Sequence, residues 1–354
     1  MLLLAPTLFL SMAQPTVAGG QTAVGSQGFA LLMPQPAAPR EPKQPLLRWA
    51  YMVGTSVPNE LEQHPEDFDY LSPAWFHLDD AGDIYGSGSP EVEAFAISHH
   101  IKLVPIVANG EFDADVAHDM LIDGTLQTHV LDSLQHLLDN PAYAGINIDF
   151  ENLYNNDRGA FSAFMTNVYA RLHPLGKQVT IALPAKTAEE ADGFATPFDY
   201  AGLAPNFDLA VVMTYDYHYA GGPAGAVSPL SWVDDVINYA TRYIPPSKLL
   251  VGLPFYGYDW DVTAGGWASP AEYSDIQQTV FDHGGQIKMV PSTQTPVYRY
   301  DDEDGDQHEI WFENSTSLGY KINLAEQHGL AGWGAWRLGQ EDQNFWSLNL
   351  SGQA

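Results

Sequence analysis

Residues 145–151 read Gly-Ile-Asn-Ile-Asp-Phe-Glu, so polar side chains at positions 147, 149 and 151 alternate with apolar ones. Successive side chains of a β-strand point to opposite faces, which places Asn147, Asp149 and Glu151 on one face. Two carboxylates at such a short distance from each other cannot both ionise freely, because burial and like charge raise the pKa of one of them. The segment therefore predicts a strand that ends in a general acid, with the outermost residue, Glu151, as the candidate. For this segment alone, carboxylates that cap the following helix remain the alternative.

Short apolar runs recur along the chain between stretches with helical spacing, an alternation typical of βα units around a parallel sheet. Eight runs are mostly dense in Val, Ile, Leu and aromatic residues: Leu47–Gly54, Tyr70–Leu78, Lys102–Ala108, Gly145–Glu151, Gln178–Pro184, Leu209–Tyr215, Leu249–Tyr256 and Gly332–Trp336. Four stretches carry apolar residues at three- and four-residue intervals: Met120–Asp139, Arg158–His173, Ser231–Tyr243 and Ser317–His328. The pattern predicts an α/β fold, a (β/α)8 TIM barrel, with Asp149 and Glu151 at the rim where barrel enzymes keep their active sites.

The connection between the seventh and eighth predicted strands is too long for a simple βα step. It runs over about residues 259–315 and contains two alternating segments, Thr295–Tyr300 and Glu309–Phe312, which predict a small α+β insertion with a hairpin. The acidic turn 301–306 does not fit a calcium-binding EF-hand loop, because Tyr300 and Trp311 occupy two ligand positions. We expect no metal site.

Composition excludes several classes of function. The formal net charge of -30, from 14 basic and 44 acidic residues, repels phosphate backbones and anionic membrane surfaces, so no nucleic acid is expected as a partner. The chain has no cysteine, which rules out disulfides, thiolate zinc sites and a cysteine nucleophile. It has no phosphate-binding glycine loop, so no nucleotide cofactor, and no other cofactor, is expected.

The N-terminal region is predicted to precede the folded domain. Residues 1–18 hold an apolar run followed by small residues, which indicates a signal peptide or an N-terminal anchor, although no Lys or Arg precedes the run. Residues 19–45 are rich in Pro, Gly and Gln and read as a flexible linker. The barrel domain is then expected over residues 46–354, and the protein to be secreted or associated with the cell envelope.

Four segments together resemble glycoside hydrolase family 18, the chitinase class. Gly145–Glu151 is similar to that family's fourth-strand signature, Met213–Asp216 to its sixth-strand motif, Gly252–Gly257 to its seventh strand, and Gly334–Trp336 to its eighth strand with a sugar-stacking Trp. The motifs occur in the expected order, and the resemblance covers roughly residues 46–350, including the insertion. Four ordered matches are far more specific than one.

The resemblance implies a substrate-assisted, retaining glycosidase that cleaves β-linked N-acetylglucosamine glycans. Glu151 would protonate the glycosidic oxygen and later activate water, while the sugar's own acetamido oxygen attacks the anomeric carbon and Asp149 orients the acetamido nitrogen. Tyr215 would bond the acetamido group and Asp216 would fix the sugar or water. The substrate-binding residues implied are Trp336 as the floor, Tyr256 and Met213 as walls, Asn147, and, on position alone, Asn109.

Two positions depart from the family's pattern, since Ala144 and Asn147 stand where it usually carries Asp. Asn147 is still expected to hydrogen-bond Asp149, but it cannot share a proton as a carboxylate would. Asn147, together with the segment Trp336-Arg337-Leu338-Gly339, resembles the branch of spore-cortex and peptidoglycan N-acetylglucosaminidases, so the expected partner is peptidoglycan or a chitin-like polysaccharide. We expect a monomer. The alternative is a catalytically weak or inactive chitinase-like carbohydrate-binding protein, against which the presence of Glu151 and Asp149 argues.

Overall fold

The computed structural model describes residues 44–190 and 193–350. The predicted signal peptide or anchor and all but the last two residues of the predicted linker lie outside these described residues. Within them, no helix is both long and apolar enough to cross a membrane.

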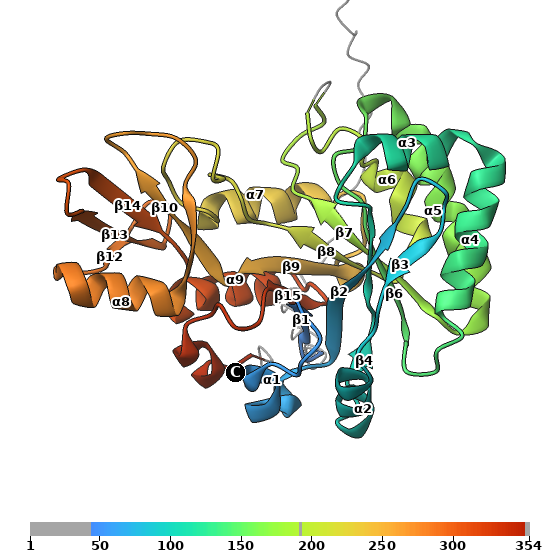
Figure 1. Cartoon of the computed structure of the whole chain (residues 1–354), viewed down its shortest axis with the longest axis horizontal. Coiled ribbons are helices and arrows are strands. Elements are labelled where there is room, and N and C mark those ends of the chain that lie inside the picture. Colours follow the sequence, from blue (N-terminus) through green and yellow to red (C-terminus); the bar gives the residue numbers. More distant parts are fainter. Residues whose placement is uncertain (1–43, 191–192, 351–354) are drawn as a thin grey trace, which may run out of the picture. The chain divides into compact units, whose positions relative to one another are not determined.

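Parallel strands close into a barrel at the centre of the domain (Figure 1). The hydrogen-bonded order is β1-β15-β9-β8-β7-β6-β5-β2, and β1 also pairs with β2, which closes the ring. The strands are β1 (Leu47–Met52), β2 (Tyr70–Leu78), β5 (Ile106–Asn109), β6 (Gly145–Asp149), β7 (Gln178–Pro184), β8 (Leu209–Met213), β9 (Leu249–Pro254) and β15 (Gly332–Trp336). The predicted (β/α)8 barrel is confirmed.

The third predicted strand is broken in two. β4 (Lys102–Leu103) and β5 both pair with β2 and are separated by Val104 and Pro105. Proline has no N–H to donate to a neighbouring strand, which accounts for the interruption. A short antiparallel strand, β3 (Ile84–Gly86), extends the outer end of β2.

The core has two layers. Side chains inside the barrel form a compact cluster of buried residues: Trp49, Tyr51, Tyr70, Val104, Ile106, Ala108, Leu209, Val211 and Leu250. A larger cluster lies between the strands and the surrounding helices, and includes Ile146 and Ile148 of β6 with Phe161 and Phe164 of a covering helix. The alternation along β6 therefore sends its apolar side chains outward to the helices and its polar ones inward.

The longer helices include α2 (Pro90–Ser98), α3 (Ala114–Ile122), α4 (Gly124–Leu137), α5 (Arg158–Leu172), α7 (Leu230–Ala240) and α9 (Ser315–Gln327), with the short α1 (Asn59–Gln63) and α6 (Tyr200–Leu203). The prediction of one helix over Met120–Asp139 is wrong. Asp123 ends α3, and its carboxylate accepts the backbone N–H groups of Thr125 and Leu126, which caps α4. A single N-cap residue thus divides the stretch into two helices.

The insertion forms a separate antiparallel sheet at one side of the barrel, on the left in Figure 1, with α3, α4 and α5 on the opposite side. Its strand order is β11-β10-β14-β13-β12. The elements are β10 (Tyr256–Asp261), β11 (Ser269–Glu272), α8 (Tyr273–His283), β12 (Lys288–Val290), β13 (Thr295–Asp301) and β14 (Gln307–Trp311). β13 and β14 form the predicted hairpin, and Asp302 organises its acidic turn by accepting the N–H groups of Asp304 and Asp306.

Candidate active site

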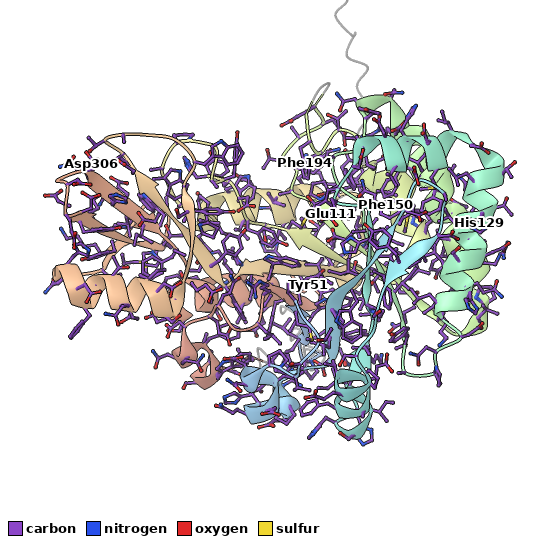
Figure 2. The ribbon with its side chains drawn as sticks, in the orientation of Figure 1. Tyr51, Glu111, His129, Phe150, Phe194 and Asp306 are labelled. Atoms are coloured by element: carbon purple, nitrogen blue, oxygen red, sulfur yellow. The ribbon has the colours of Figure 1, made fainter. Side chains whose placement is uncertain are left out.

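A cavity of about 510 Å³ opens at the carboxyl ends of the barrel strands, within the range of about 300–1,000 Å³ usual for small-molecule sites. Strand ends of the barrel supply most of its base, and β10 and β11 of the insertion supply one wall. The lining residues are Tyr51, Phe112, Asp149, Glu151, Ala182, Pro184, Ala185, Phe194, Met213, Tyr215, Asp216, Trp232, Tyr256, Tyr258, Pro270, Trp336, Arg337 and Gln340. In Figure 2, Phe194 lies on the loop after β7 and Tyr51 lower, toward the barrel. Asp306 lies at the outer end of the insertion.

Asp149 and Glu151 lie together at the end of β6. Burial raises the pKa of Asp149 to about 7. Burial, together with the charges of Asp149 and Asp216, raises the pKa of Glu151 to about 8. Both causes disfavour the carboxylate form, so a protonated carboxylic acid is present near neutral pH. This is the state that a general acid requires.

The sixth-strand residues face the same carboxylates. Burial raises the pKa of the Tyr215 hydroxyl well above the usual value, and the charges of Asp149, Glu151 and Asp216 add to the shift. The ring of Tyr215 needs the glycine opposite, since a Cβ at Gly252 would lie 2.9 Å from that ring and 2.5 Å from the backbone oxygen of Val212. The seventh-strand glycine is therefore a packing requirement of the site.

Asp216 is held in place by the insertion. Its Oδ1 accepts hydrogen bonds from the hydroxyl of Tyr256 at 2.7 Å and from the hydroxyl of Tyr258 at 3.0 Å. Asp216 also has a φ of 58°, a left-handed conformation that side chains other than glycine adopt rarely. The two tyrosines of β10 thus fix the orientation of a carboxylate on a constrained turn.

Trp336 and Met213 line the cavity, as the resemblance implied. The ring of Trp336 lies 5.5 Å from that of Tyr51, centroid to centroid, at an angle of 53°. Its backbone oxygen accepts a hydrogen bond of 2.7 Å from the N–H of Phe255, which ties the ends of β15 and β9 together. The partly buried indole is therefore a fixed apolar surface for a sugar ring.

Asn109 and Asn147 lie beneath the cavity rather than in its lining, and both are fully buried. The Oδ1 of Asn109 accepts the N–H of Glu151, and its Nδ2 donates to the carbonyl oxygen of Glu151, each at 2.9 Å. Asn147 makes no hydrogen bond to Asp149, contrary to expectation. Its Nδ2 donates to the hydroxyl of Tyr51 at 3.0 Å. These two amides position the site, and neither is placed to touch a substrate.

The variant Asn109→Ala is expected to lower kcat with little change in KM. It removes both hydrogen bonds that hold the backbone of Glu151, and leaving buried polar groups unpaired costs about 1–3 kcal/mol of stability. Steady-state kinetics with urea unfolding measures both effects. Asn206→Ala, which removes one amide bond to the carbonyl of Gly202 at 3.0 Å, is the matched control. Equal changes of kcat in the two variants would contradict the positioning role.

Several lining residues carried no motif in the sequence. Tyr51 is the last but one residue of β1, and Tyr258 lies on β10. Phe112, Phe194 and Trp232 come from loops or a helix start. The position of Tyr51 in the first predicted strand was the one usable signal, because a residue at a strand's carboxyl end faces the active-site rim. The others depend on how loops fold back over the barrel.

No group of three or more His, Cys, Asp or Glu side chains that could hold a metal ion occurs within residues 44–190 and 193–350. In the acidic turn of the insertion, the Asp302 carboxylate accepts the backbone N–H groups of Asp304 and Asp306.

Comparisons with known proteins agree with this geometry. The pattern of the family described as Glycosyl hydrolases family 18 matches residues 82–341. The chain is 31% identical over 325 residues to the Cortical fragment-lytic enzyme of Bacillus subtilis (strain 168), covering 88% of this chain and 75% of that protein. It superimposes with a TM-score of 0.79 and 27% identity on the Bacillus cereus spore cortex-lytic enzyme SleL, covering 87% of this chain and 74% of that one. A chitinase from Chromobacterium violaceum gives the same TM-score and identity, over 85% of this chain and 97% of its own.

The fold, the paired carboxylates and these relatives define a glycosidase built on a TIM barrel. The chain belongs to glycosyl hydrolases family 18, and spore-cortex enzymes are among its most similar relatives. The family predicted from the four motifs is confirmed, and so is the branch predicted from Asn147 and the segment that begins at Trp336.

Proposed function

We propose that this glycosidase cleaves β-linked N-acetylglucosamine glycans, peptidoglycan or a chitin-like polymer, by substrate-assisted retaining catalysis. The observation that carries the proposal is the pair Asp149 and Glu151 at the end of β6, raised in pKa and facing Tyr215 and Trp336 in one cavity. Two relatives, one named a cortical fragment-lytic enzyme and the other a chitinase, support both polymer classes.

In the first step Glu151 donates its proton to the glycosidic oxygen as the bond from that oxygen to the anomeric carbon breaks. The acetamido oxygen of the same sugar forms the new bond to the anomeric carbon, giving an oxazolinium-like intermediate. The positive charge that develops there lies next to the carboxyl of Asp149, which stabilises it. The leaving sugar departs with a neutral hydroxyl group.

In the second step Glu151, now a carboxylate, takes a proton from water. The water oxygen attacks the anomeric carbon and displaces the acetamido oxygen, so the product keeps the β configuration. Glu151 ends protonated, as it began. Asp149 Oδ1 is buried without a hydrogen-bond partner among the described residues, so it is open to accept the N–H of the acetamido group.

The test is product analysis on purified peptidoglycan and on chitin oligosaccharides. Release of reducing ends with N-acetylglucosamine as the new reducing sugar, initially as the β anomer by NMR, is expected with the natural protein and not with Glu151→Gln. Binding of either glycan without turnover by the natural protein would favour the carbohydrate-binding alternative.

The pH profile tests the role of Glu151 separately. Glu151 must be protonated to act, and its pKa is raised to about 8, so kcat/KM is expected to fall as pH rises through about 8. An aryl glycoside, whose leaving group needs little protonation, should show a weaker alkaline fall. A fall centred near 4.5, the ordinary value for glutamic acid, would contradict the assignment.

A further inference from the structure

Arg337 is the one cationic side chain in the cavity lining, as far as the structure describes the chain. It follows directly after Trp336, the predicted floor of the reacting sugar. The chain as a whole has only 14 basic residues against 44 acidic ones. The net negative charge of the protein repels anions, so a cation in this cavity is a local exception to the charge of the whole chain.

The guanidinium is only weakly engaged by the protein. Its contact is with Glu272 of β11, Nη2 to Oε1, at 3.5 Å, and both side chains are about one-third exposed, at 32% and 38%. Glu272 Oε1 also accepts a hydrogen bond of 3.1 Å from Nε2 of Gln340, another lining residue. One long contact leaves most of the five N–H donors of this arginine without a partner among the described residues.

Arg337 does not serve the catalytic carboxylates. The charges that act on Glu151 are those of Asp149 and Asp216, and no cation lowers the pKa of either Asp149 or Glu151. A guanidinium close to them would stabilise their charged forms. Arg337 lies in the lining of the same cavity and contacts Glu272 of β11, in the wall made by the insertion.

A guanidinium binds a carboxylate through two parallel N–H···O bonds, a geometry that neutral sugars do not offer. We propose that Arg337 pairs with a carboxylate borne by the sugar next to the one on Trp336, so that the substrate is an acid-bearing N-acetylhexosamine glycan rather than neutral chitin. This inference rests on the proposed function and specifies its substrate class. In peptidoglycan such a carboxylate belongs to the lactyl ether of alternate sugars or to the peptide attached there.

The test compares three glycans: peptidoglycan strands freed of peptide, the same strands with their carboxyl groups reduced to alcohols, and intact peptide-bearing strands. For the natural protein, reduction of the carboxyls is expected to lower kcat/KM at least about tenfold, the worth of about 1.4 kcal/mol. Arg337→Gln should abolish this preference, and Arg337→Lys should keep part of it, since an ammonium retains the charge but not the paired geometry. A preference for peptide-bearing over freed strands that depends on Arg337 would assign the carboxylate to the peptide.

The matched control is Arg171→Gln, which removes the same charge from α5, where the guanidinium pairs with Asp132 at 2.7 Å. It should retain the preference of the natural protein. If Arg337→Gln keeps the preference as well, the inference is overturned.

Failure of the proposed function can be distinguished from failure of the inference about Arg337. If the natural protein hydrolyses none of the three glycans, the same comparison is made by calorimetric binding with Glu151→Gln and with Glu151→Gln/Arg337→Gln. Tighter binding of the acid-bearing strand that disappears without Arg337 supports the inference even then. Equal binding of acid-bearing and reduced strands by both proteins overturns it.

Discussion

The Glu151→Gln variant is expected to lose a factor of about 10²–10⁴ in kcat, the usual contribution of a positioned general acid. Glutamine has the shape of glutamic acid but no proton to donate to the glycosidic oxygen. The hydrogen bonds from Asn109 reach the backbone of residue 151 and are kept, so the cavity should keep its form. KM or the binding constant for the glycan should change little. Initial rates on a defined oligosaccharide, with binding measured in parallel, give the result.

The stability of Glu151→Gln shows whether a loss of activity could come from unfolding. Because the pKa of Glu151 is raised on folding, the natural protein loses stability as pH rises from the ordinary value of 4.5 toward 8, where the native state holds the extra proton. Glutamine does not titrate, so the variant does not lose this part of its stability as pH rises. At pH 8 its melting temperature should therefore be no lower than that of the natural protein. Glu303→Gln, in the exposed turn of the insertion, is the matched control and should keep full activity. Activity within a factor of about three of the natural protein in Glu151→Gln would exclude Glu151 as the acid.

The variant Lys321→Met is expected to cost about 3–5 kcal/mol of unfolding free energy, the largest stability effect that we predict. Lys321 on α9 and Glu313 are both fully buried, and Nζ lies 2.6 Å from Oε2. The other carboxylate oxygen of Glu313 has no partner among the described residues, so the lysine is its main compensation. Without the lysine, a buried carboxyl must stay charged and unpaired or take up a proton. Urea unfolding measures the loss.

The double variant Glu313→Leu/Lys321→Met separates the ion pair from the packing of α9. Replacing both partners with apolar side chains is expected to recover most of the loss, because two desolvated charges contribute little net stability. A loss below about 1 kcal/mol in Lys321→Met alone would mean that Glu313 finds another partner or water. Neither variant changes a residue of the cavity lining.

The strands were predictable because their residues are buried on both faces. The bounds of β2, β7 and β15 agree with those predicted from runs of apolar residues. The third strand was predicted as one continuous strand, whereas Pro105 divides it into β4 and β5. The long helix was predicted as one, whereas Asp123 ends α3 and caps α4. Both errors come from single residues whose local hydrogen bonding outweighs the pattern of their neighbours.

The site was predictable where it lies on strand ends. Asp149, Glu151, Tyr215, Asp216, Tyr256, Met213 and Trp336 all line the cavity. Asn109 and Asn147 were also predicted as site residues from their positions on strands. The depth of a residue along its strand, however, decides whether its side chain contacts the substrate or lies beneath the site and supports it. Burial of both amides, and the bonds of Asn109 to Glu151, follow from the packing of β5 against β6.

By itself the sequence determined the barrel, the family and the identity of the paired carboxylates, because side-chain periodicity along a strand is a local property of the chain. The tertiary structure decided what surrounds those carboxylates: the tyrosines of β10 on Asp216, Tyr51 above Asn147, and Arg337 against Glu272. These contacts join residues from 40 to 96 positions apart in sequence. Their distances, and the pKa values that depend on burial, arise only when separate βα units and the insertion pack around one cavity.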